Sequence, residues 1–136
     1  MRVLVTGATG YVGGRLVPRL LDREYDVRVM VRDPARIAGR EWSDRVEVVR
    51  GDIEDPESLE PVLDGVEAAY YLIHLMDSGR GFVHRDREAA RSFVAAAGHL
   101  RHVIYLGGLL PEGEKVSDHL ASRAEVGRIL REGLPT

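Results

Sequence analysis

The chain contains no cysteine. This absence excludes disulfide bonds, metal sites built on thiolates and a cysteine nucleophile. A long hydrophobic run is also missing near the N-terminus, because the apolar residues 3–5 are followed at once by the turn-forming Thr6 and Gly7. A run this short can form neither the core of a signal peptide nor a membrane span. We therefore expect a cytoplasmic protein that makes no membrane contact.

The sequence also lacks an excess of charge of one sign. Its 136 residues carry 19 basic and 22 acidic side chains, which are interleaved and give a net charge of −3. This balance offers no electrostatic footprint for nucleic acid, so a bound anion must be held by local features. The histidines have no metal-ligand spacing, and we predict no metal site. The length suits one domain.

Short apolar runs rich in β-branched and aromatic residues alternate with helical patterns. The predicted strands are residues 3–5, 27–31, 46–49, 68–73 and 103–106. The first predicted helix starts near residue 11. Three more are predicted at residues 55–63, 82–97 and 118–132, and the helix at 82–97 is expected to be the longest. Strict alternation of strand and helix predicts a doubly wound parallel α/β sheet, the three-layer Rossmann architecture, over residues 1–136.

Three details of the helices follow from the same patterns. Val12, Leu16 and Leu20 are spaced to lie on the buried face of the first helix. Asp55 is expected to cap the second helix. Gly133 is expected to cap the C-terminus of the last helix.

Gly7, Gly10 and Gly13 form a G-x-x-G-x-x-G pattern between the first strand and the first helix. A tight turn, a close backbone approach to pyrophosphate and close helix packing each require a residue without a Cβ atom. The unpaired N–H groups of the helix then bind the diphosphate without a lysine. A plain glycine-rich turn is the alternative, whereas a P-loop is excluded because no Gly-Lys-Ser/Thr follows. The expected cofactor contacts are Gly7, Thr9, Gly10, Tyr11 and Val12.

Residues 6–13 resemble the signature of the extended and atypical short-chain dehydrogenase/reductase superfamily, which includes nucleotide-sugar epimerases and NmrA-like proteins. The likeness continues through residues 31–34, Gly51-Asp52-Ile53 and Tyr105-Leu106-Gly107-Gly108. The resemblance implies that Asp52 and Ile53 lie beside the adenine of NAD(P). It also implies that Leu72, Ile73 and His74 border the ribose and nicotinamide side of the site.

The end of the second strand bears on the choice between NADP and NAD. An acidic residue there accepts a hydrogen bond from the ribose 2′-OH, whereas an arginine pairs with a 2′-phosphate. Arg32 comes first after the strand, and Asp33 precedes Pro34, which suits Asp33 to capping the following turn. These positions favour NADP, with NAD as the second choice. The alternative that Arg32 is an ordinary surface arginine remains open.

The resemblance fails at the catalytic residues. Enzymes of the superfamily usually carry a tyrosine and, four residues later, a lysine, yet the matching positions here are His119 and Arg123. Arginine can hold a ribose but cannot replace a lysine of tuned pKa. Histidine is able to exchange a proton near neutral pH. Surface positions for both side chains are the alternative, and the catalytic residues stay unassigned.

Two functions therefore remain open. One is the NAD(P)-binding domain of an oxidoreductase or a sugar-nucleotide epimerase/dehydratase, acting on an unknown small molecule; the other is a non-catalytic NmrA-like sensing or structural module. Residues 133–136 resemble the loop that enters a sixth strand. We accordingly expect an N-terminal part of a longer protein, with the substrate-binding part absent. The oligomeric state is open.

Overall fold

The computed structural model describes residues 1–75, 81–107 and 117–136. Its centre is a parallel sheet of strands β1 (Arg2–Thr6), β2 (Asp26–Val31), β3 (Glu47–Arg50), β4 (Ala68–Tyr71) and β5 (His102–Tyr105). The spatial order is β3-β2-β1-β4-β5, so the chain winds outward from β1 in both directions. This order confirms the predicted doubly wound Rossmann sheet.

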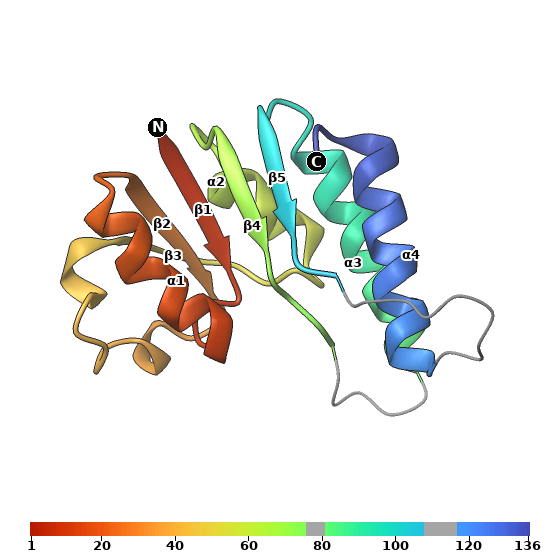
Figure 1. Cartoon of the computed structure of the whole chain (residues 1–136), viewed down its shortest axis with the longest axis horizontal. Helices are drawn as coiled ribbons and strands as arrows, with labels where there is room; N and C mark the ends of the chain where they lie inside the picture. The colour runs from red at the N-terminus through yellow and green to blue at the C-terminus, as the bar shows by residue number, and fades with distance from the viewer. Residues whose placement is uncertain (76–80, 108–116) are drawn as a thin grey trace.

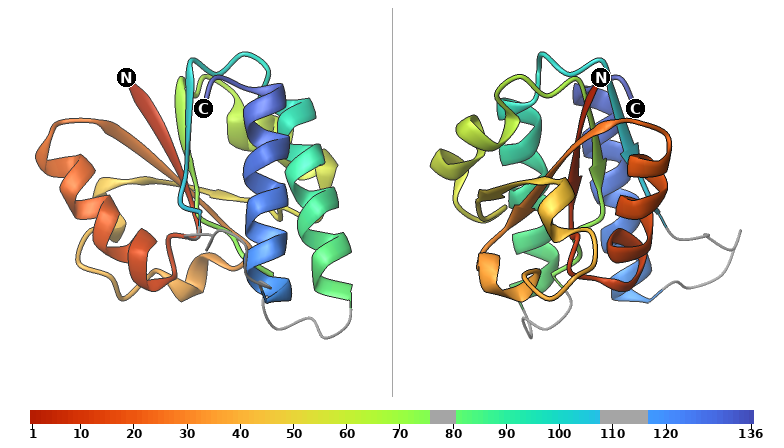
Figure 2. Two further views of the ribbon diagram at one scale, coloured as in Figure 1. Left: turned by 45° about the vertical axis from the view of Figure 1, so that its right-hand side comes forward. Right: turned by 90° about the vertical axis from the view of Figure 1, so that its left-hand side faces the viewer.

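The helices form one layer on each face of the sheet. Helix α1 (Tyr11–Asp22) covers one face, while α2 (Leu59–Leu63), α3 (Phe82–Ala96) and α4 (Asp118–Gly133) cover the other. Figure 2 shows α1 on one side of the sheet and α3 and α4 side by side on the opposite side. In Figure 1 all strands point the same way, so their carboxyl ends share one edge.

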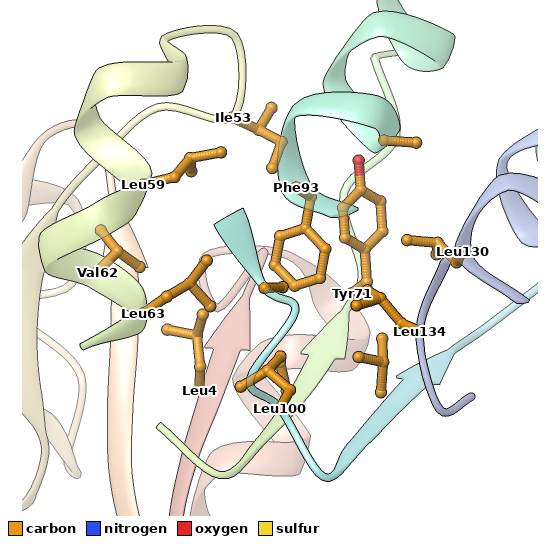
Figure 3. Close-up of a cluster of buried hydrophobic side chains, with 14 of the residues drawn as sticks. Leu4, Ile53, Leu59, Val62, Leu63, Tyr71, Phe93, Leu100, Leu130 and Leu134 are labelled. Carbon is orange, nitrogen blue, oxygen red and sulfur yellow. The ribbon is translucent and has the colours of Figure 1, made fainter. Parts of the chain in front are cut away.

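Alternate strand residues supply the two cores. Val3, Val5 and Val29 face α1, whereas Leu4 faces the larger core beneath α2, α3 and α4. In the larger core the Tyr71 ring meets the Phe93 ring edge to face, with centroids 5.1 Å apart (Figure 3). Strands covered on both faces explain the nearly continuous apolar runs in the sequence.

Several predicted boundaries differ from the structure. The fourth strand ends at Tyr71, two residues earlier than expected, and Leu106 lies beyond the end of β5. Helix α4 has 16 residues and α3 has 15, so the prediction that α3 is the longest was wrong. Gly133 is the last residue of α4 and Leu134 takes the cap position. A Cβ atom on Gly133 would lie 2.3 Å from Val94 Cγ1, so close helix packing, not capping, requires the glycine.

Two expectations about helix starts were also wrong. Val12 is 45% exposed instead of buried, because Gly13, Val17 and Leu20 form the inner face of α1. Asp55 precedes the short 3₁₀ turn Pro56–Ser58 but makes no capping hydrogen bond through its side chain. The Asp33 carboxylate does cap its turn, since Oδ1 accepts a hydrogen bond from Ala35 N at 3.0 Å.

Candidate functional site

The turn between β1 and α1 is closed by its own backbone. Gly7 has φ +73°, a left-handed conformation that glycine adopts without strain. Gly10 N donates to Gly7 O at 3.1 Å, and Gly14 N donates to Gly10 O at 2.9 Å, which starts α1. The first N–H groups of the helix therefore point out of the turn without partners inside the helix.

The glycines of this turn differ in how much room a side chain would have. A Cβ atom on Gly13 would lie 2.2 Å from Gly7 O, and one on Gly7 would lie 3.0 Å from Leu72 O. Both positions are closed by the protein's own backbone. A Cβ atom on Gly10 would meet nothing closer than Gly7 O at 3.4 Å, so the chain itself leaves room there. Gly10 therefore matches the predicted position for close approach of a ligand.

Thr6 fastens the turn to the neighbouring strand. Its hydroxyl donates to Tyr70 O at 2.8 Å and accepts from Leu72 N at 3.0 Å. Thr6 is fully buried, so these bonds satisfy a hydroxyl that water does not reach. The segment after β4 is held against the glycine turn by this side chain, whose role the sequence did not suggest.

A cleft of about 250 Å³ opens at the carboxyl ends of β1, β2 and β4. This is the switch point of the sheet, where the chain winding reverses and where ligands of such folds bind. Most of the site residues expected from the sequence line the cleft: Gly7, Thr9, Gly10, Arg32, Asp52, Ile53, Leu72, Ile73 and His74. Gly108, from the last motif, lies outside the described residues.

Tyr11 and Val12 do not line the cleft. They begin α1, and their side chains are 74% and 45% exposed. The Arg15 guanidinium lies 3.6 Å from the centre of the Tyr11 ring. Only their backbone N–H groups, in the first turn of the helix, remain available to a ligand in the turn.

The lining also includes six residues that were not predicted as site residues: Met30, Val31, Arg36, Gly51, Glu54 and Leu75. Arg36 ends the 3₁₀ turn Pro34–Arg36 that Asp33 caps. The capping signal at Asp33 and Pro34 could have suggested that the chain turns back and brings Arg36 beside Arg32. Gly51 belongs to the Gly51-Asp52-Ile53 motif, and a Cβ atom on it would lie 2.6 Å from Val62 Cγ2.

One end of the cleft carries a fixed set of acidic groups. Asp52 Oδ1 accepts a hydrogen bond from Glu54 N at 2.9 Å, which holds the turn after β3. Arg85 Nε donates to Glu54 Oε1 at 2.6 Å. This bond keeps the pKa of Glu54 below its ordinary value, and the same bond raises the pKa of Arg85. The charge of Glu54 is thereby balanced locally.

The other end of the cleft carries His74, with ionisable groups of three elements around it. Burial lowers the pKa of His74, the positive charge of Arg123 on α4 lowers it further, and the negative charge of Asp86 on α3 opposes both. The Tyr105 ring of β5 lies 6.2 Å from the His74 ring, centroid to centroid. Burial raises the pKa of Tyr105 to about 12, and its hydroxyl donates to Arg123 O at 3.1 Å.

His119 and Arg123 take different places. The His119 ring stacks on Phe82 at the start of α3, with centroids 4.4 Å apart, and it does not line the cleft. Arg123, one turn later on α4, is half-buried and acts electrostatically on His74 and Tyr105. The pair therefore does not reproduce a tyrosine and a lysine acting together on one ligand.

Neither a metal cluster nor a membrane-spanning helix is found in the described part of the chain. Within residues 1–75, 81–107 and 117–136, no group of three histidine, aspartate or glutamate side chains is placed to hold a metal ion. In the same part of the chain, no helix is both long and apolar enough to cross a membrane.

Comparison with known proteins identifies the family. Residues 7–132 match the family described as NAD(P)H-binding. The chain belongs to this family. The match spans the glycine turn, the cleft and most of α4, so the prediction that this chain binds NAD(P) is confirmed.

Curated relatives include dehydrogenases and reductases. The chain is 32% identical over 106 residues to "3 beta-hydroxysteroid dehydrogenase/Delta 5-->4-isomerase" of Mycobacterium tuberculosis, covering 78% of this chain and 28% of that protein. It is 34% identical over 121 residues to a Streptomyces griseus (4-alkanoyl-5-oxo-2,5-dihydrofuran-3-yl)methyl phosphate reductase, covering 89% and 39%. The chain thus spans well under half the length of these relatives.

Solved structures agree on the fold. Triphenylmethane reductase of Citrobacter superimposes with a TM-score of 0.81 at 22% identity, over 98% of this chain and 46% of that chain. A nucleoside-diphosphate-sugar epimerase from Staphylococcus aureus gives a TM-score of 0.81 at 18% identity, over 98% and 47%. At these identities the likeness establishes the Rossmann fold alone.

Proposed function

We propose that the chain binds NADP(H) in preference to NAD(H), as the nucleotide-binding part of an oxidoreductase or epimerase. The observation that carries the preference is the pair of arginines, Arg32 and Arg36, that line the cleft beyond the end of β2. Guanidinium groups pair with phosphate through charge-assisted hydrogen bonds. Asp33, which would favour NAD, is not among the lining residues and its Oδ1 already caps Ala35 N.

The rest of the cleft fits a dinucleotide. The backbone-lined turn at Gly7, Thr9 and Gly10, with the N–H groups of Tyr11 and Val12, suits the pyrophosphate. Asp52 and Ile53 would lie beside the adenine. Leu72, Ile73 and His74 would border the nicotinamide, which when bound would give a hydride to a carbonyl or accept one from an alcohol.

The preference is tested by fluorescence titration of NADPH and NADH. We expect NADPH to bind at least about tenfold more tightly, and Arg32→Ala and Arg36→Ala each to weaken NADPH by roughly three- to tenfold while leaving NADH unchanged. Arg19→Ala is the matched control, because Arg19 is exposed in the last turn of α1. Equal affinity for the two cofactors, or an Arg32→Ala/Arg36→Ala double variant with unaltered NADPH affinity, would contradict the preference.

A second candidate is a module that binds the dinucleotide without turnover. The stacking of His119 on Phe82 favours it, since this ring serves the contact between α3 and α4 and does not line the cleft. NADPH bound to such a module would stay reduced when carbonyl compounds, a 3-ketosteroid among them, are added. Oxidation of NADPH at a rate that depends on the added compound would favour the enzyme.

A further inference from the structure

Asp86 on α3 is a buried carboxylate with two well-defined partners. It is 8% exposed, and a charge so far from water is stable only if hydrogen bonds satisfy it. Its Oδ1 accepts from Leu75 N at 3.1 Å, and its Oδ2 accepts from the Ser122 hydroxyl at 3.0 Å. Both oxygens of the carboxylate are therefore engaged.

These two bonds join the cleft to the helical layer. Leu75 lines the cleft just after β4, whereas Ser122 is buried in α4, next in sequence to Arg123. Helices α3 and α4 lie side by side in both views of the molecule (Figures 1 and 2). A shift of Asp86 would therefore move the wall of the cleft relative to α4.

Asp86 acts on His74 through charge as well. His74 precedes Leu75, and both residues line the cleft. Within residues 1–75, 81–107 and 117–136, the charged and titratable groups that influence it are Asp86 of α3, Arg123 of α4 and, by ring contact, Tyr105 of β5. Of these, only Asp86 supplies a negative charge, which favours the protonated imidazole.

Joining α3 to α4 does not by itself require this carboxylate. Arg87 Nε and Glu125 Oε1, at 2.8 Å, already link the two helices, and apolar residues of both pack in the larger core. The bond from Leu75 N to Asp86 instead reaches a segment that belongs to neither helix. Its effect is to fix the backbone beside His74.

We propose that Asp86 is a positioning residue for the nicotinamide half of the cleft, which holds Leu75 and His74 in place for the dinucleotide. The inference rests on the proposed function. Under this proposal, ligand binding in the adenosine half of the cleft, around Arg32 and Asp52, does not depend on Asp86. The two halves can therefore be tested separately with NADPH and with adenosine 2′,5′-bisphosphate, which lacks the nicotinamide half.

The test compares Asp86→Ala with Ser122→Ala in the 136-residue chain. Asp86→Ala should weaken NADPH about tenfold and leave adenosine 2′,5′-bisphosphate within roughly threefold, because the bond to Leu75 N and the charge near His74 both act on the nicotinamide half. Ser122→Ala keeps that bond and should leave both affinities within about threefold. Equal loss of both ligands in Asp86→Ala, or no loss of either, overturns the positioning role. Binding of neither ligand by the parent chain overturns the proposed function and this inference together.

Asp86→Asn gives an independent readout if the alanine variant does not fold. The amide keeps the shape of the side chain but removes the charge, so the pKa of His74 should fall below that of the parent. The imidazole is followed by NMR titration, and its signal is assigned with His74→Gln. An unchanged pKa of His74 in Asp86→Asn would show that Asp86 does not act on His74, and it would overturn the proposed role of Asp86 at the nicotinamide end of the cleft.

Discussion

Gly13 and Gly14 are adjacent in α1 but have different surroundings. A Cβ atom on Gly13 would meet the backbone of the turn, at 2.2 Å from Gly7 O and 2.9 Å from Ala8 Cα. A Cβ atom on Gly14 would meet Arg40 Nη1 at 2.8 Å, the far end of a flexible side chain. The same substitution at the two positions therefore compares a clash with the backbone of the turn with displacement of the Arg40 guanidinium, whose Nη2 donates to Thr9 O at 3.0 Å.

We expect Gly13→Ala to weaken NADPH binding at least about tenfold and to lower the free energy of unfolding by about 1–3 kcal/mol, because the turn must shift. Gly14→Ala should weaken NADPH binding less than Gly13→Ala, because only the exposed bond from Arg40 to Thr9 O has to shift, and up to about 1 kcal/mol of helix propensity offsets that shift. Cofactor titration and urea denaturation measure the two effects. If Gly13→Ala binds NADPH as the parent does, the turn is not the phosphate site.

How far the site could be predicted also differs from residue to residue. The glycine turn is a local motif between a strand and a helix, so its position at the cleft followed from sequence order, whereas the position of Asp52 was implied by the resemblance to the superfamily. Asp86 could not be found in this way, since it stands between Arg85 and Arg87, and such a run indicates a solvent-exposed face. Its burial results from the packing of α3 against α4, which no local pattern contains.

At the scale of elements, Arg28 joins β2 to the C-terminus of α2. It is 5% exposed, and its Nε donates to Glu47 Oε2 at 2.9 Å. Its Nη1 donates to Val62 O at 2.8 Å and Asp64 O at 2.7 Å, carbonyls at the end of a five-residue helix. A short helix is marginal alone, so this guanidinium supplies the partners that its last turn lacks.

Replacing this arginine should therefore cost stability. We expect Arg28→Met to lower the free energy of unfolding by about 2–4 kcal/mol, because buried carbonyls lose a charged donor. Arg28→Lys should fall between this variant and the parent, since one ammonium cannot reproduce the fork of bonds. Arg2→Met is the control, since Arg2 pairs with Asp26 and Glu47 at the surface and its loss should change little. A urea midpoint for Arg28→Met equal to that of Arg2→Met would refute this role.

The elements themselves were largely predictable, because alternating apolar runs and helical patterns are local. The errors lie at the ends, where tertiary contacts decide. Leu72 and Ile73 were expected in the fourth strand, yet the strand ends at Tyr71 and the Thr6 hydroxyl, not a neighbouring strand, bonds Leu72 N. Gly133 was assigned to a cap by its sequence position, whereas its contact with Val94 belongs to the packing of α3 on α4.

At the scale of the whole molecule, half-buried titratable groups limit stability on both sides of neutral pH. The pKa of His74 is lowered from 6.5, so the folded state binds protons less readily than the unfolded chain. Its contribution is complete above pH 6.5 and is lost as the pH falls through the folded value. Burial raises the pKa of Tyr105 from 10.0 to about 12, so its contribution is complete below pH 10.0 and is lost above it. Burial raises the pKa of Tyr71 as well.

These directions predict a stability plateau between about pH 6.5 and 10, with a fall on either side. His74→Gln should make the loss of stability below pH 6.5 less steep. Tyr105→Phe should do the same above pH 10, because each variant removes one group whose pKa changes on folding. His102→Gln and Tyr25→Phe are matched controls at exposed positions and should follow the parent curve. The measurement is the free energy of unfolding in urea across this pH range. If His74→Gln loses stability as steeply as His102→Gln below pH 6.5, the acid side of the curve does not arise from the histidine at the cleft.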